Sequence, residues 1–106
     1  MIRLEVIANN SVEENILEAF SNAGVGKYYT KIPGVHGVGS SGPRKGDAIW
    51  PEENFLLIIW CEIEEARLIE QELLKVKELF PDEGIRVFGL DEEGGGTGTE
   101  APASGV

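Results

Sequence analysis

An uninterrupted apolar run in the middle of the chain limits the folds that it can adopt. Residues 55–61 read FLLIIWC, and acidic residues lie close by on both sides. A run of this length that is bounded by charges is typical of a central strand covered on both faces. The fold must therefore provide cover on two sides of one strand.

Three other segments predict strands. Residues 2–8 alternate apolar side chains with Arg3 and Glu5, which is the pattern of a half-buried strand. Residues 26–32 contain two tyrosines and a threonine, which favour extended backbone. Residues 85–90 follow a tight turn and form the last predicted strand.

Two stretches predict helices. Ser11 stands three residues before Glu14, which is a capping-box pattern, and Gly24 is placed to end this first helix. Its apolar stripe comprises Val12, Ile16, Ala19, Phe20 and Ala23. The second helix spans about residues 64–80. Its apolar face comprises Ala66, Ile69, Leu73, Val76 and Phe80, widened by Leu68, Leu74 and Leu79.

The order of these elements predicts an α+β fold, a ferredoxin-like βαββαβ sandwich. Its antiparallel sheet carries both helices on one face. Cover for the other face of residues 55–61 would then come from another copy of the chain, so we expect a homo-oligomer. The alternative is that the central strand leaves some apolar groups exposed. We expect one folded domain over residues 1–90 and a disordered, acidic, glycine-rich tail over residues 91–106.

Charge and composition exclude several classes of partner. The 106 residues carry a formal net charge of −10, which argues against nucleic acid or an anionic membrane surface as the main partner. No apolar run approaches the roughly 18–20 residues of a membrane span. The first residues do not read as a signal peptide, and the single Cys61 cannot form an intrachain disulfide. We therefore expect a cytoplasmic protein.

The segment from Pro33 to Glu53 is far longer than the two to five residues that could join two strands as a hairpin. It is rich in glycine, and it lies largely in a stretch between Glu18 and Asp47 that has no acidic residue. Closely spaced glycines let backbone N–H groups converge on an anion, and serine hydroxyls and basic side chains add to such a site. The predicted ligand-binding residues are Gly37, Val38, Gly39, Ser40, Ser41, Arg44 and Lys45. The alternative is a solvated loop with incidental charge.

Residues 35–42, which read VHGVGSSG, resemble the V-x-G-F-G-x-x-x-G pattern at the base of the T-loop in the PII signalling family. Together with the predicted βαββαβ order over residues 1–90, this indicates a PII-like protein of the PII/CutA-like superfamily. The resemblance implies a trimer that binds an adenine nucleotide in clefts between subunits. The T-loop would report that ligand to a membrane transporter or an enzyme.

Two departures from the PII pattern bear on the ligand. The turn at residues 80–84 lacks the second glycine-rich loop of PII proteins, and Asp91, Glu92 and Glu93 stand where PII proteins carry phosphate-binding arginines. The chain therefore looks like a PII-like relative rather than a nitrogen-regulatory PII protein. Its expected effector is ADP, AMP, ATP or a small anion such as bicarbonate, and no fixed cofactor is expected.

A metal-binding, CutA-like protein is the alternative function. His36 could bind a metal with Asp47, Glu52, Glu53 or Cys61, but no cluster has zinc-site spacing. We do not expect an enzyme, because one histidine and one cysteine form no recognisable catalytic set. Cys61 closes the apolar run and is predicted to be a buried core residue.

Overall fold

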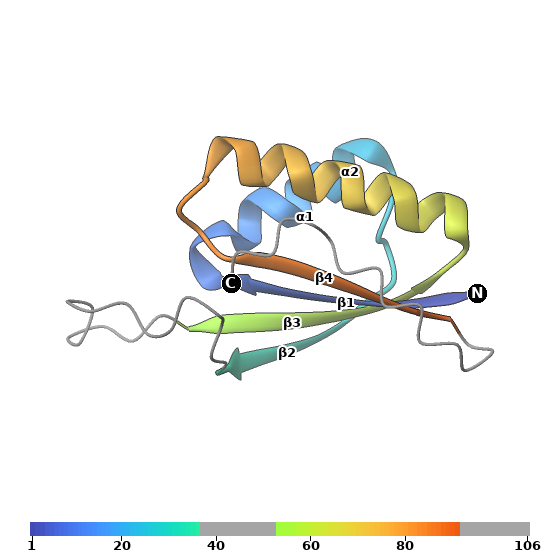
Figure 1. Ribbon diagram of the computed structural model, residues 1–106, viewed down its shortest axis with the longest axis horizontal. Coiled ribbons are helices and arrows are strands. Elements are labelled where there is room, and N and C mark those ends of the chain that lie inside the picture. The colour runs from blue at the N-terminus through green and yellow to red at the C-terminus, as the bar shows by residue number, and fades with distance from the viewer. Residues whose placement is uncertain (37–52, 92–106) are drawn as a thin grey trace.

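The computed structural model describes residues 1–36 and 53–91, which form one four-stranded sheet and two helices. The elements in chain order are β1 (Ile2–Asn9), the 3₁₀ turn η1 (Asn10–Val12), α1 (Glu13–Ala23), β2 (Thr30–Val35), β3 (Asn54–Cys61), α2 (Ile63–Leu79) and β4 (Ile85–Asp91). The strand order is β2-β3-β1-β4 and every pairing is antiparallel. Both helices lie on the same face of the sheet (Figure 1). The predicted ferredoxin-like α+β fold is confirmed.

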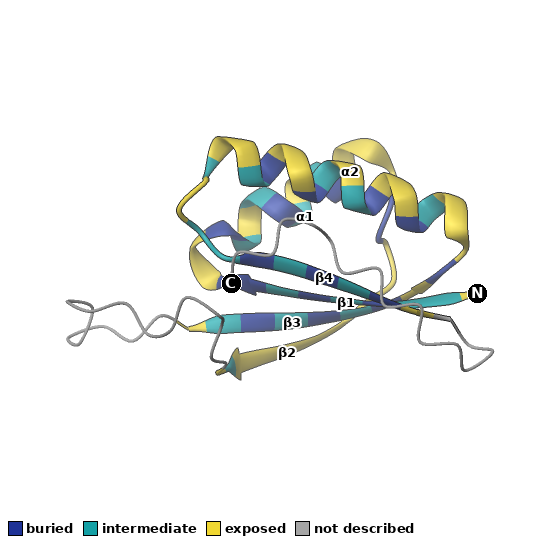
Figure 2. Cartoon of the chain, viewed as in Figure 1, coloured by how far each residue is buried: buried dark blue, intermediate teal, exposed yellow. Residues whose placement is uncertain are grey.

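The core lies between the sheet and the helices. Val6 of β1 stands opposite Leu57 of β3 and Val87 of β4, and all three side chains are buried. From the helices, Ile16, Phe20, Ile69 and Leu73 are buried against this layer (Figure 2). Burial of apolar area at about 25 cal/mol per Å² is the main force that holds such a small domain together.

The other face of the sheet is open and largely apolar. Along β3, burial alternates, so that Phe55 and Leu57 face the helices while Leu56 and Ile58 do not. Trp60, on the same side as Leu56, is 51% exposed. By register, the open face comprises Arg3, Glu5, Ile7, Thr30, Ile32, Leu56, Ile58, Trp60, Arg86, Phe88 and Leu90. The prediction that the apolar run needs cover beyond the two helices is consistent with this arrangement.

A charged pair crosses the open face. The Arg3 guanidinium lies 2.9 Å from the Glu5 carboxylate and 5.9 Å from the centre of the Trp60 ring. An ion pair and a cation–π contact both reduce the cost of holding charge next to apolar side chains.

The start of α1 differs from the predicted capping box. Ser11 lies within the 3₁₀ turn, and its backbone N–H donates to the Asn9 side chain at 2.8 Å. The helix proper begins at Glu13 and has no side-chain cap. The Ser11–Glu14 capping box is therefore wrong, because Asn9 already caps the preceding turn. The end at Gly24 is confirmed, with the left-handed φ of 70° that favours glycine there.

The apolar faces of both helices are narrower than predicted. In α2, Ala66, Ile69, Leu73 and Val76 are buried and Phe80 packs at the edge of the core. The widening residues Leu68, Leu74 and Leu79 are exposed instead, as is Ala23 at the end of α1. Two positions along a helix turn the side chain by about 200°, which carries Leu68 away from the face that Ala66 occupies. No helix among the described residues is long and apolar enough to cross a membrane.

The second strand begins later than predicted. β2 covers Thr30–Val35, so residues 26–29 precede it and the connection to β3 starts at His36. Gly26 has a φ of 62°, which an extended strand does not allow, and its N–H donates to the Glu65 carboxylate at 2.9 Å. Pro33 is tolerated because β2 is an edge strand with a register shift between Ile32 and Val35.

Cys61 lies in the core, as predicted. It is 4% exposed. Burial raises the pKa of its thiol to about 11, and the negative charges of Glu65 and Glu62 contribute in the same direction. A thiol with so high a pKa carries little thiolate at neutral pH and is a poor nucleophile.

We expect Gly26→Ala to destabilise the protein more than Gly24→Ala. Both positions have positive φ, which costs an alanine about 1 kcal/mol. At position 26 the new Cβ would also lie 2.7 Å from the Phe20 ring, whereas at position 24 it meets nothing within 4 Å. Overpacking adds about 1–3 kcal/mol. Urea unfolding of the two variants measures the difference, and equal losses would show that the Phe20 ring yields freely.

We expect Cys61 to react slowly with a thiol-specific disulfide reagent at pH 8. Its raised pKa lowers the thiolate fraction about a hundredfold relative to an unburied thiol, and burial restricts access further. Because it is the single cysteine of the chain, the measured rate belongs to Cys61 alone. The chain unfolded in guanidinium chloride is the control. A native rate equal to the unfolded rate would contradict the buried position.

Candidate functional site

The predicted ligand-binding residues lie between the two parts of the chain that the structure describes. Gly37, Val38, Gly39, Ser40, Ser41, Arg44 and Lys45 all fall within residues 37–52, outside the described residues. The structure describes both ends of this loop, namely Val35–His36 and Glu53–Asn54, and these ends fix the point at which the loop leaves the sheet.

Both ends of the loop meet at one corner of the sheet. Val35, the last residue of β2, is paired with Asn54, the first residue of β3. The Asn10 N–H donates to the Glu53 carbonyl at 2.9 Å, which joins the start of β3 to the end of β1. The Asn9 N–H donates to the Gly84 carbonyl at 3.0 Å, which brings the turn before β4 to the same place. β1 and β2 end in this region, and β3 and β4 begin there. We call this region the loop corner (Figure 1).

The loop corner is polar next to an apolar face. Asn9 is 6% exposed and stands opposite Asn54 across the β1–β3 pairing. An amide side chain can both donate and accept hydrogen bonds, so it suits either a phosphate oxygen or a base edge. The Asn9 side-chain carbonyl oxygen already accepts from the Ser11 N–H. Asn54 is partly exposed at the foot of the loop.

Arg86 is the second residue of β4, next to the loop corner, and it was not among the residues predicted for the site. Ile7 of β1 is paired with Leu56 on one side and with Arg86 on the other. The Arg86 guanidinium lies 5.3 Å from the centre of the Phe88 ring. An arginine is always charged and can bind a carboxylate or a phosphate through two parallel hydrogen bonds. Its position between the core residues Ile85 and Val87 was the available signal, because alternation places it on the open face.

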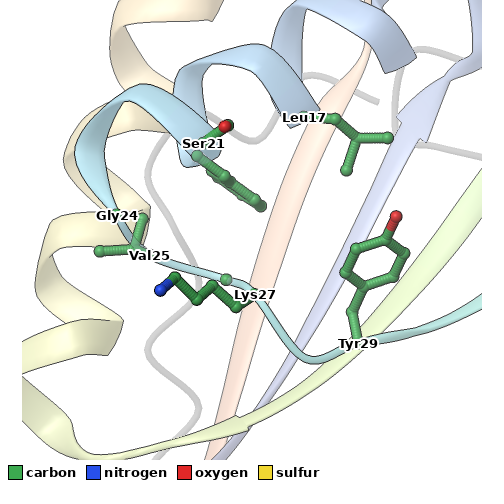
Figure 3. A pocket seen from close by; sticks show the side chains of 8 residues that line it. Leu17, Ser21, Gly24, Val25, Lys27 and Tyr29 are labelled. Atoms are coloured by element: carbon green, nitrogen blue, oxygen red, sulfur yellow. The ribbon is translucent and has the colours of Figure 1, made fainter.

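A cavity of about 280 Å³ lies away from the loop corner, between the end of α1 and the segment that leads into β2 (Figure 3). It is lined by Leu17, Phe20, Ser21, Gly24, Val25, Gly26, Lys27 and Tyr29. Residues 26–29 were predicted to form part of a strand, so this cavity was not expected from the sequence. Both tyrosines of this segment are exposed, Tyr28 by 86% and Tyr29 by 43%.

The metal alternative finds little support in the described part of the chain. Within residues 1–36 and 53–91, no group of three His, Cys, Asp or Glu side chains could hold a metal ion. His36 follows Val35, which pairs with the first residue of β3, whereas Cys61 ends that strand, roughly 20 Å away along the backbone. A site formed by His36 and Cys61 of one chain is therefore excluded. Asp47 and Glu52 lie outside the described residues.

Comparison with known proteins identifies the fold. No family model and no curated sequence matches the chain. Among solved structures, it is similar to CPII, a nitrogen regulatory PII-like protein from Thiomonas intermedia K12, bound to ADP, AMP and bicarbonate. The TM-score is 0.64 and the identity 22%, over 84% of this chain and 82% of CPII. CPII bound to ADP, AMP and acetate gives a TM-score of 0.60 at 23% identity, over 83% and 81% of the two chains.

A second similar protein comes from Thermus thermophilus and is classed as a PII-like signalling protein. It is 28% identical, with a TM-score of 0.59 over 84% of this chain and 83% of that chain. These matches cover 84% of this chain and agree with the PII-like resemblance that was stated from the sequence. The chain therefore has the fold of these PII-like proteins.

Proposed function

We propose that this chain is a non-enzymatic regulatory protein that binds an adenine nucleotide, ADP, AMP or ATP, in clefts between the subunits of a homotrimer. The observation that carries the proposal is the loop corner, where a long glycine-rich segment leaves and rejoins a PII-like sheet. Nucleotide binding is supported by CPII, whose solved structures hold ADP, AMP and bicarbonate or acetate. The loop would then act as a T-loop that reports the ligand to a membrane transporter or an enzyme in the cytoplasm.

The chemistry of the loop suits an anionic ligand. We assign backbone N–H donors to Gly37, Val38 and Gly39, hydroxyl donors to Ser40 and Ser41, and positive charge to Arg44 and Lys45. Arg86 adds a cation on the open face, one pairing step from the corner. It could replace part of the charge that PII proteins place after their fourth strand, where this chain is acidic. The predicted boundary at residue 90 moves by one position because β4 ends at Asp91, so we assign the regulatory domain to residues 1–91 and treat residues 92–106 as an acidic tail.

The open face supports a trimer. Trp60 is half-exposed, and Ile32 and Leu90 on the same face are each about as exposed. Exposed apolar groups that gather on one face of a sheet are typical of an interface with another chain. Copies of the chain that covered it would also bring neighbouring loop corners and open faces together. Shared clefts of the proposed kind would form there.

We expect adenine nucleotides to raise the melting temperature, and Arg44→Gln and Lys45→Gln to weaken their binding. A ligand at 100 times its Kd stabilises a protein by about 2.7 kcal/mol. Loss of a charge-assisted hydrogen bond costs about 1.5–3 kcal/mol, or at least tenfold in affinity. Calorimetry with ATP, ADP and AMP, with and without bicarbonate, measures both effects. Lys75→Gln is the matched control, because Lys75 lies exposed on α2 and pairs with Glu72.

The opposite result would favour the metal-binding alternative. If no nucleotide raises the melting temperature while Cu²⁺ or Zn²⁺ does so, and His36→Ala abolishes that rise, the nucleotide proposal fails. If Arg44→Gln and Lys45→Gln bind nucleotide as strongly as the Lys75→Gln control does, the loop does not contribute to the nucleotide site.

Light scattering is expected to give three times the 11.5 kDa chain mass at micromolar concentration. Trp60→Glu should reduce the measured mass to that of one chain, because the substitution places a carboxylate in the apolar open face. Leu79→Glu is the control, since Leu79 is 74% exposed on α2 and lies outside that face. A single-chain mass for the unmodified protein would overturn the shared-cleft proposal.

A further inference from the structure

We propose that the cavity between α1 and residues 24–29 is a separate ligand site that takes a small aromatic carboxylate. It lies at the end of α1, whereas the loop corner lies near its start, so the two sites are at opposite ends of one helix (Figures 1 and 3). The proposal does not depend on nucleotide binding at the loop corner.

The segment that forms the cavity wall is held in place by its backbone. The Val25 N–H donates to the Phe20 carbonyl at 3.0 Å and the Gly24 N–H donates to the Ser21 carbonyl at 3.2 Å. The Gly26 N–H donates to the Glu65 carboxylate of α2 at 2.9 Å. These bonds fix consecutive residues against both helices. The cavity is therefore formed before a ligand arrives, which lowers the entropic cost of binding.

The cavity is apolar on one side and aromatic on another. Leu17 and Val25 line it, together with Phe20, which is only 2% exposed and so forms the floor. In Figure 3 the Tyr29 side chain reaches from the start of β2 toward Leu17. Flat rings pack well against such surfaces, with ring centres about 4.5–7 Å apart. An aromatic ring is the group that this lining would hold.

The polar groups of the cavity favour an anion. The Ser21 hydroxyl, the Lys27 ammonium and the Tyr29 hydroxyl line it, and none has a hydrogen-bond partner among the described residues. Lys27 is the one charged residue of the lining, and none of the lining residues is acidic. Glu65, which approaches from α2, is engaged by the Gly26 N–H. The lining therefore offers one cation and two hydroxyl groups, of which a carboxylate seated beside Tyr29 would meet the Tyr29 hydroxyl and, once the lysine side chain turns, the Lys27 ammonium.

The size of the cavity suits a ligand with one ring. Pockets that bind drug-sized molecules measure about 300–1,000 Å³, so a volume of about 280 Å³ lies just below that range. A benzoate-like acid is of a size that this volume can hold. Lys27 directs its ammonium away from the Tyr29 ring in Figure 3. Its long flexible stem allows the ammonium to follow the carboxylate of a ring that is seated beside Tyr29.

The test is a titration of the full chain, labelled with ¹³C in the Leu and Val methyl groups, with salicylate. We expect the largest shifts at Leu17 and Val25. Lys27→Met, which keeps most of the stem and removes the charge, should weaken salicylate binding about fourfold. Lys75→Met, the matched loss of one exposed lysine, should leave it unchanged. Benzyl alcohol, which lacks the carboxylate, should bind equally to the parent and to Lys27→Met.

A second variant tests the cavity itself. Ser21→Trp places a ring in the mouth of the cavity and should abolish the methyl shifts while the remaining spectrum stays native. If this variant does not fold, Tyr29→Ala removes one wall and should weaken salicylate at least as much as Lys27→Met does. Shifts centred on Leu56 and Leu90 of the open face, or equal affinities for Lys27→Met and Lys75→Met, would overturn the proposal.

Discussion

Antiparallel pairing of β1 with both β3 and β4 determines which side chains meet the helices. Because β1 lies between these two strands, Val6 is held between Leu57 and Val87, and the same alternation puts Glu5 between Ile58 and Phe88 on the opposite face. A shift of one residue in this register would exchange the two faces. The core, the open face and the position of Arg86 all follow from that single choice of register.

The same register brings distant parts of the chain to the loop corner. The backbone hydrogen bonds from Asn9 to Gly84 and from Asn10 to Glu53 use the amides at the end of β1 and just beyond it. They satisfy donors that would otherwise be unpaired as the chain leaves the sheet. As a result, the start of α1, the foot of the loop and the turn before β4 form one rigid base.

The fold could be predicted from the sequence because apolar residues recur with a different period in its strands than in its helices. The alternation in residues 2–8 and the apolar run in residues 55–61 identified strands, and their burial agrees with that assignment. Residues 26–29 were assigned wrongly because their conformation depends on Glu65, 39 positions away from Gly26. Local alternation places Arg86 on the open face, but its neighbour Ile7 comes from a strand that is far away in sequence. The cavity was missed because residues 26–29, which form its wall, were predicted as a strand.

The least buried strand connects the two candidate sites. β2 pairs only with β3, its pairing shifts between Ile32 and Val35, and most of its side chains are exposed. Toward the helices it is tied by Lys31, whose ammonium lies 2.6 Å from the Glu13 carboxylate at the start of α1. A partly exposed ion pair of this kind contributes about 0–1 kcal/mol. β2 is thus the part of the sheet that moves at the lowest cost. The cavity wall, which backbone hydrogen bonds hold in place, precedes β2, and the connection to β3 follows it. Both candidate sites therefore adjoin a weakly held strand, while the core behind it stays fixed.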